Sequence, residues 1–237
     1  MQPVPQTRFR ELVKAVCNGA YRPEDLRLYG EIEDWDTSEI VNMAGAFMHR
    51  TGFNRDISRW NTSSVVSMQC MFYNAYYFDQ PVGSWDTSKV TDMSSMFASA
   101  SHFNQPLDTW DVSQVTSMTA MFAYAEYFNQ PLESWNVSRV RCMESMFQSA
   151  YRFCQPVWRW DVLRVRSMKR MFKNAYCFLQ MMEEGSDGFS LTDWCVSYRR
   201  TCVTRMFADD DEIVEFWSHH RFPIHPAWPR RSGPRCL

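Results

Sequence analysis

Residues 85–109 read WDTSKVTDMSSMFASASHFNQPLDT, and the same pattern recurs in consecutive segments of equal length along most of the chain. The pattern returns at intervals of 25 residues, in columns of tryptophan, methionine, phenylalanine and alanine. A fixed period of this length is typical of a repeat array, in which each copy is one coil that buries its apolar side only by stacking on its neighbours. The tryptophan column consists of Trp35, Trp60, Trp85, Trp110, Trp135 and Trp160.

The pattern predicts one short strand and one short helical segment in each copy. The β-branched residues at 90–91 favour a strand, and the apolar spacing within residues 94–100 fits one or two turns of helix. Pro106 then favours an extended corner, because proline cannot continue a helix. One polar column should form a ladder that satisfies backbone groups between stacked coils, and its members are Asn54, Asp79, Asn104 and Asn129.

The sequence predicts an α/β repeat solenoid in four parts, with helical caps at both ends. Residues 1–31 form an N-terminal cap, because Phe9, Leu12, Val13 and Val16 have amphipathic helical spacing. Residues 32–182 contain six repeats, and residues 183–207 contain an insertion and a degenerate seventh repeat that ends at Met206 and Phe207. Residues 208–237 should hold a C-terminal helix and a proline-rich tail.

Three segments of the repeat resemble a known family. Residues 90–97 (VTDMSSMF), 103–107 (FNQPL) and 110–113 (WDVS) are similar to the BspA-like leucine-rich repeats, in the branch with a 25-residue "surface protein" unit. The resemblance covers residues 32–182. It implies a right-handed solenoid of the leucine-rich-repeat type, used for adhesion or protein binding and without catalytic residues.

Composition excludes several classes of protein. Apolar residues make up 45% and charged residues 22% of the 237 residues, which is typical of a globular protein. No apolar run is long enough to span a membrane, and residues 1–20 lack the continuous apolar core of a secretory leader. The eight cysteines include no C-x-x-C pair, which favours reduced thiols inside a cell. A cell-surface location is the alternative.

No catalytic signature occurs in the chain. The sequence lacks G-x-S-x-G, a Walker loop, G-x-G-x-x-G and H-E-x-x-H. The histidines at 219, 220 and 225 match no common metal-ligand spacing. We therefore expect no enzyme activity, no cofactor and no metal.

Charge is distributed unevenly, although the net charge is only −2. Residues 139–173 hold nine bases and two acids, and residues 11–39 hold eight acids and three bases. Arginines at alternate positions of one strand, repeated in the next coil, should form a compact square on one face. The predicted partner-binding residues are Arg139, Arg141, Arg164, Arg166, Lys169, Arg170 and Lys173.

This basic face has several interpretations. It is a solvated surface without a partner, a docking site for an acidic or phosphorylated protein, a nucleic-acid site, or one half of a head-to-tail contact with the acidic end. An isoelectric point of about 6.2 favours protein over nucleic acid. The sequence thus predicts a non-enzymatic interaction scaffold, such as an accessory subunit of a larger assembly, with a surface adhesin as the rival.

Overall fold

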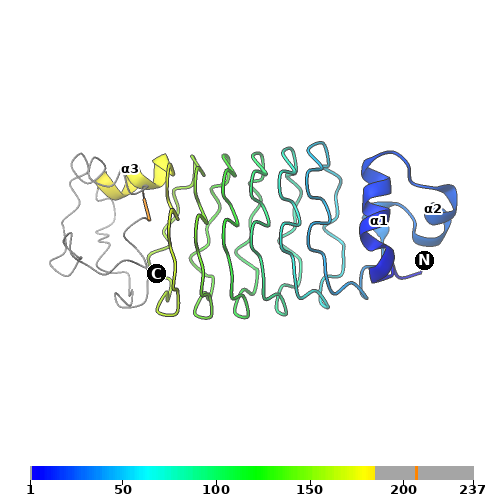
Figure 1. The fold of residues 1–237 in the computed structure, drawn as a ribbon, viewed down its shortest axis with the longest axis horizontal. Helices are drawn as coiled ribbons and strands as arrows, with labels where there is room; N and C mark the ends of the chain where they lie inside the picture. Colours follow the sequence, from blue (N-terminus) through cyan, green and yellow to red (C-terminus); the bar gives the residue numbers. More distant parts are fainter. Residues whose placement is uncertain (1, 185–205, 208–237) are drawn as a thin grey trace.

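The computed structural model describes residues 2–184 and 206–207. Its residues 35–175 form successive coils stacked along the long axis of the molecule (Figure 1). We number these coils one to six, each beginning at a residue of the tryptophan column. Helices α1 (Gln6–Cys17) and α2 (Pro23–Tyr29) and the 3₁₀ turn η1 (Ile32–Asp34) precede the coils, and helix α3 (Tyr176–Glu184) follows them.

Backbone hydrogen bonds join each coil to the next. A single residue per coil forms a parallel bridge, in the series Asn42, Ser67, Asp92, Ser117, Cys142 and Ser167. Alternate residues of the following segment also donate across the gap, from Ser95 N–H to the carbonyl of Thr119 at 2.7 Å and from Phe97 N–H to that of Met121 at 2.9 Å. The predicted strand therefore reduces to one bridging residue, although the parallel pairing extends well beyond it.

The predicted helical segment of each repeat is wrong. Among residues 2–184, every helix lies outside the span from 35 to 175, where the chain forms consecutive β-turns. Met96 N–H donates to the carbonyl of Met93 at 3.2 Å, and Ser95 inside this turn has a φ of 55°. A helix would use every N–H internally, whereas these turns leave alternate N–H groups to bond the next coil.

The left-handed turn position gives a test of this geometry. Ala120 has a φ of 53°, and the equivalent residue of coil one is Gly45, at 66°. A left-handed conformation costs a non-glycine residue about 1–2 kcal/mol, while glycine adds about 0.5–1 kcal/mol of chain entropy. We expect Ala120→Gly to raise the free energy of unfolding by about 0.5–1 kcal/mol in chemical denaturation.

Ala44 is the matched control for this prediction, because its φ is not positive. Ala44→Gly should lower the free energy of unfolding by about 0.5–1 kcal/mol, since it adds entropy without relieving strain. Equal effects of the two substitutions would contradict the turn geometry.

The core is a set of parallel aromatic columns. Phe97 stacks between Phe72 and Phe122, with ring centroids 5.5 and 5.7 Å apart, and Phe103 lies 3.9 Å from it. All four rings are fully buried. The indole of Trp110 donates from Nε1 to the carbonyl of Val82 at 3.0 Å, and the tryptophans of coils two to six repeat this bond. The residues that dominate the composition therefore build the core.

The polar column forms the expected ladder. Asp79 Oδ1 accepts hydrogen bonds from Asn104 N–H and from Gln105 Nε2, both at 2.9 Å. Asn104 Oδ1 accepts the equivalent bonds from Asn129 N–H at 2.8 Å and Gln130 Nε2 at 3.1 Å. Each side-chain oxygen thus accepts hydrogen bonds from a backbone N–H and a side-chain amide of the following coil.

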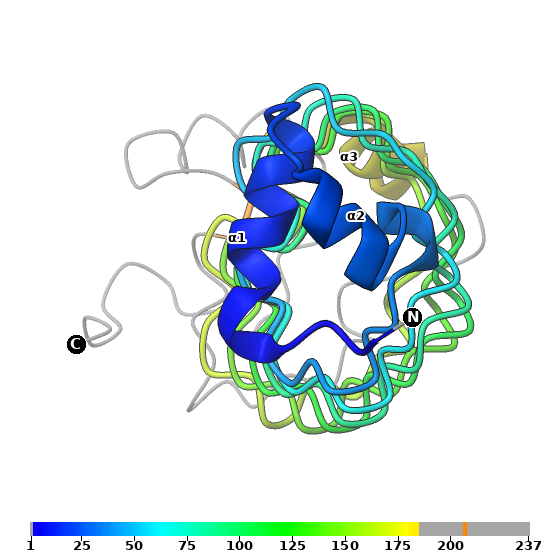
Figure 2. The same ribbon diagram turned by 90° about the vertical axis from the view of Figure 1, so that its right-hand side faces the viewer.

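Both ends of the aromatic columns are covered. Figure 2 shows α1 and α2 lying across the first coil, and α1 buries Phe9, Leu12 and Val13 against it. The ring of Phe9 lies 5.6 Å from that of Trp60. At the other end, Phe172 N–H donates to the carbonyl of Met206 at 2.9 Å, and Phe207 stacks on Phe172 at 5.9 Å.

Helix α3 was not predicted from the sequence. Coils two to five carry proline at the equivalent position, namely Pro81, Pro106, Pro131 and Pro156, but coil six has Met181. Loss of this proline removes a block to a helix, but coil one, with Asp56 at this position, forms no helix there. The predicted C-terminal helix and proline-rich tail of residues 208–237 lie outside the described residues. No helix within residues 2–184 or at 206–207 has the length and apolar character that a membrane span requires.

Candidate partner-binding surface

Four arginines of coils five and six lie on one side of the stack. Arg139, Arg141, Arg164 and Arg166 are all exposed, whereas Val140 and Val165 between them are fully buried. Arg166 N–H donates to the carbonyl of Arg141 at 2.8 Å, so these two residues are direct neighbours in adjacent coils. We call these four residues the arginine square.

The arginine square lacks internal neutralisation. Arg139 donates from Nη1 to the Gln114 side-chain oxygen, and no ion pair within residues 2–184 or at 206–207 involves the four guanidinium groups. The two nearby acids serve the fold instead. Asp161 Oδ1 accepts from Leu163 N–H at 3.1 Å, and Glu144 accepts from Ser167 Oγ at 3.4 Å. Four exposed positive charges without carboxylate partners repel one another and attract an anionic ligand.

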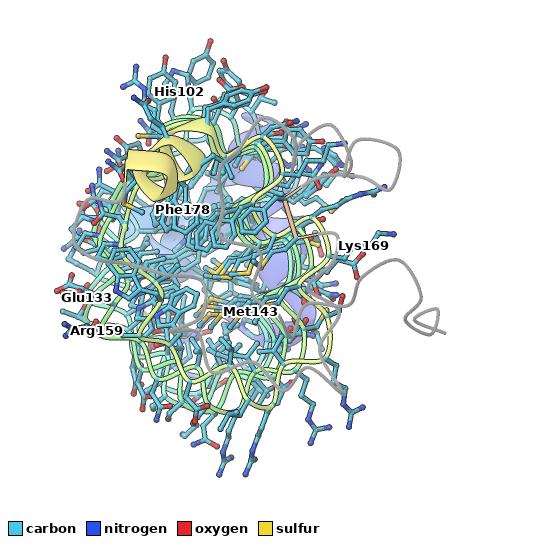
Figure 3. All side chains as sticks on the ribbon, turned by 90° about the vertical axis from the view of Figure 1, so that its left-hand side faces the viewer. His102, Glu133, Met143, Arg159, Lys169 and Phe178 are labelled. Carbon is cyan, nitrogen blue, oxygen red and sulfur yellow. The ribbon has the colours of Figure 1, made fainter. Side chains whose placement is uncertain are left out.

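The three remaining predicted residues lie in the turn segment that follows the bridge at Ser167. Lys169, Arg170 and Lys173 are half-buried, and their segment bonds coil five, with Ser145 N–H donating to the carbonyl of Lys169 at 2.8 Å. In Figure 3, Lys169 lies on one side of the cross-section and Arg159 on the opposite side. The basic residues therefore extend around part of the circumference, and the arginine square is their most exposed group.

The acidic end is mostly neutralised by arginines. Asp25 is buried and binds Arg8 and Arg22, each at 2.9 Å, and the hydrogen bond from Arg8, followed by that from Arg22, lowers the pKa of Asp25. Arg55 pairs with two glutamates of η1 and its flank, and Arg59 pairs with Asp34 at 2.7 Å. This end is consequently a poor match for a basic partner, which disfavours head-to-tail association.

The described residues contain no group of three or more histidine, cysteine, aspartate or glutamate side chains that could hold a metal ion. The histidines at 219, 220 and 225 lie outside this part of the chain. No disulfide joins the five described cysteines, which are Cys17, Cys70, Cys142, Cys154 and Cys177.

A second exposed surface was missed in the sequence. Six of the twelve large apolar side chains that are exposed in the described residues are tyrosines near one corner of the coil. Their columns also contain Thr51, Ser101 and Glu126, so residue type alone gives no pattern, and only the repeat register brings them together. We call the following residues the tyrosine ridge: Tyr76, Tyr77, His102, Tyr127, Arg152 and Tyr176.

Comparison with known proteins places the chain in a repeat family. A family model described as "Mycoplasma protein of unknown function, DUF285" matches residues 23–94, 77–186 and 104–212. The three matches overlap and together cover residues 23–212, as expected when one model matches successive registers of a repeat. No curated protein and no solved structure matches the chain.

Proposed function

The chain belongs to this family of repeat-containing proteins of unknown function, and we propose that it is a non-enzymatic scaffold that docks an acidic protein surface through the arginine square. The observation that carries this proposal is the group of four exposed, unneutralised guanidinium groups on adjacent coils. Arginine forks suit carboxylates and phosphates, and the stacked backbone holds them on a fixed grid. An accessory subunit of a larger assembly is the role that fits such a rigid module.

The fold class belongs to the same proposal. We infer a right-handed solenoid related to the BspA-like leucine-rich repeats, supported by the 25-residue register and by parallel bridges between consecutive coils. Solenoids of stacked repeats bind partners through their extended surfaces. A catalytic role has less support, since buried methionine, phenylalanine and tryptophan occupy the interior where a catalytic cavity would be required.

Charge reversal of the arginine square tests the docking proposal. The test variant combines four substitutions, Arg139→Glu, Arg141→Glu, Arg164→Glu and Arg166→Glu. It should bind a fluorescent glutamate-rich peptide of 12 residues on the order of a hundredfold more weakly than the native chain, because attraction at four sites becomes repulsion. Fluorescence anisotropy at low salt and at raised salt measures the affinity. Salt should weaken binding to the native chain, since exposed charges are screened beyond about 8–10 Å at physiological ionic strength.

A matched control changes the same net charge elsewhere. Arg10, Lys14, Arg27 and Arg59 are exposed residues of the N-terminal cap and coil one, and their replacement by glutamate should change the affinity less than about threefold. Equal loss in both variants would mean that only net charge matters and would refute the docking site. A single-stranded DNA 12-mer, added in parallel, separates the alternatives, because tighter binding of DNA than of the peptide would favour a nucleic-acid site.

A further inference from the structure

The tyrosine ridge is a rigid exposed feature that the arginine square does not explain. Tyr77 and Tyr176 are 55% and 62% exposed, which is unusual for aromatic residues in a repeat with a closed core. The backbone of the ridge is nevertheless fixed by hydrogen bonds between coils. His102 N–H donates to the carbonyl of Tyr76, and Tyr127 N–H donates to that of Ser101, both at 3.1 Å. Figure 3 shows His102 at the outer edge of the cross-section, well separated from Lys169.

The ridge presents aromatic rings and hydroxyl groups. The imidazole of His102 stacks on Tyr127 with centroids 5.3 Å apart, and the guanidinium of Arg152, from the next coil, lies 4.4 Å from the same ring centroid. The faces of Tyr127 are therefore occupied from both neighbouring coils. The hydroxyl groups of the four tyrosines of the ridge, at 76, 77, 127 and 176, have no hydrogen-bond partner within residues 2–184 or at 206–207.

This arrangement selects a particular ligand chemistry. Bases that bind to aromatic side chains use open ring faces, which Tyr127 cannot offer. Exposed tyrosine rings beside free hydroxyl donors suit a ligand with apolar rings and unpaired carbonyl oxygens. A polyproline II segment has both, because its backbone forms no internal hydrogen bonds and its prolines project at every third residue. Proline-rich segments of this kind dock on aromatic surfaces.

The chain itself carries a segment of this kind. Residues 222–229 read FPIHPAWP, with Pro223, Pro226 and Pro229 at intervals of three. Fifteen positions separate Phe222 from the described Phe207, which allows a reach of up to about 50 Å. The ridge extends over the coils from Tyr76 to Tyr176, a distance of about 20 Å at the spacing of paired strands. We propose that the tyrosine ridge is the docking site of the chain's own proline-rich segment, residues 222–229.

A peptide-binding measurement on the full chain tests this inference. The probe is a fluorescent peptide with the sequence of residues 222–229, which contains no lysine or arginine. The key variant is Pro223→Ala, Pro226→Ala, Pro229→Ala, which removes the internal competitor. The variant should bind the probe at least about tenfold more tightly than the native chain, because a tethered segment competes at an effective concentration near the millimolar range. A probe in which the three prolines are alanine should not bind.

Ridge variants complete the test. Adding Tyr77→Ala and Tyr176→Ala to the proline variant should reduce probe binding at least about tenfold, since exposed tyrosines are typical binding hot spots. Adding Leu28→Ala and Leu163→Ala, which are exposed residues outside the ridge, should leave binding unchanged. Absence of probe binding, or binding insensitive to the tyrosines, would overturn the inference.

Two further outcomes separate this inference from others. Equal probe binding by the native chain and by the proline variant would show that the internal segment does not occupy the ridge, and would also overturn it. Charge reversal of the arginine square in the proline variant should leave probe binding unchanged. The two proposals can therefore fail independently.

Discussion

Replacement of Phe122 by alanine is expected to lower the free energy of unfolding by about 3–5 kcal/mol. The ring is fully buried in coil four, and its centroid lies 5.7 Å from those of both Phe97 and Phe147 and 4.0 Å from that of Phe128. Coils on both sides are hydrogen-bonded at fixed spacing, so they cannot collapse into the cavity. Most of the lost contact energy should therefore remain unrecovered.

The position of Phe122 adds a second consequence. In a repeat array each coil contacts only its neighbours, so the coupling between coils determines whether the array unfolds as one unit. A cavity in coil four weakens both of its interfaces and should broaden the denaturation curve or split it into two transitions. Chemical denaturation followed by tryptophan fluorescence and by circular dichroism measures both effects.

Phe122→Leu is the graded control, because it keeps most of the apolar volume and should cost less than about 1.5 kcal/mol. Tyr124→Ala, in the same coil but 45% exposed, should cost still less. A Phe122→Ala variant as stable as Tyr124→Ala would contradict the stacked core.

The aromatic core could be predicted because identical coils place equivalent residues in equivalent environments. Tryptophan, methionine and phenylalanine recur in fixed columns, so they can be assigned to the interior without knowledge of the backbone conformation. The backbone conformation was harder to predict. The spacing of Met96, Phe97 and Ala100 fits a helix as well as a series of turns, and the deciding residues are Ser95 and Ser99 at positive φ. Serine, cysteine and alanine at such positions carry little signal. The residue types that do favour positive φ, at Gly45, His49, Asn74 and Asn174, occur in only three of the six coils.

The exposure of Arg139 and Arg141 on either side of the buried Val140 is what alternation along a strand-like segment predicts. Their role in binding a partner stays a prediction. Neutralisation of the acidic end could not be predicted in the same way. The counter-charges of Glu31, Glu33 and Asp34 come from arginines in coil one, outside the segment over which the charge was counted. Charge summed over a window of sequence therefore overestimates the field of a surface whose partners come from another coil.

Loss of the ladder residue Asn104 is expected to lower the free energy of unfolding by about 1–2 kcal/mol. Asn104→Ala removes the acceptor of Asn129 N–H, a half-buried group of coil four. Gln130 Nε2 loses one bond but keeps its bond to the backbone carbonyl of Asn104 at 2.9 Å. Each unpaired buried polar group costs about 1–3 kcal/mol, and partial access of water reduces this cost. Chemical denaturation measures the loss, and hydrogen exchange should show reduced protection of the Asn129 amide in particular.

Asp79 supplies the matched control for the ladder. It occupies the same column in coil two and accepts the same two bonds through its carboxylate. Asn104→Asp should therefore retain the ladder and cost less than about 1 kcal/mol at neutral pH, although it adds a charge. If Asn104→Asp proved as destabilising as Asn104→Ala, the side-chain acceptor would not be the stabilising group.

The ladder also has a direction, and this sharpens the prediction. Each side-chain oxygen accepts from the following coil, so Asn104→Ala should expose the Asn129 amide while the amide of Asn104 stays bonded to Asp79. The series ends at Cys154, whose amide still bonds Asn129 Oδ1 but whose thiol donates to the carbonyl of Cys177 at 3.3 Å. At the next position of this column, Leu179 N–H donates instead to the carbonyl of Ala175 at 3.0 Å, within α3. A central substitution should therefore loosen the C-terminal neighbour first, and symmetric loss of protection in coils two and four would contradict the directional ladder.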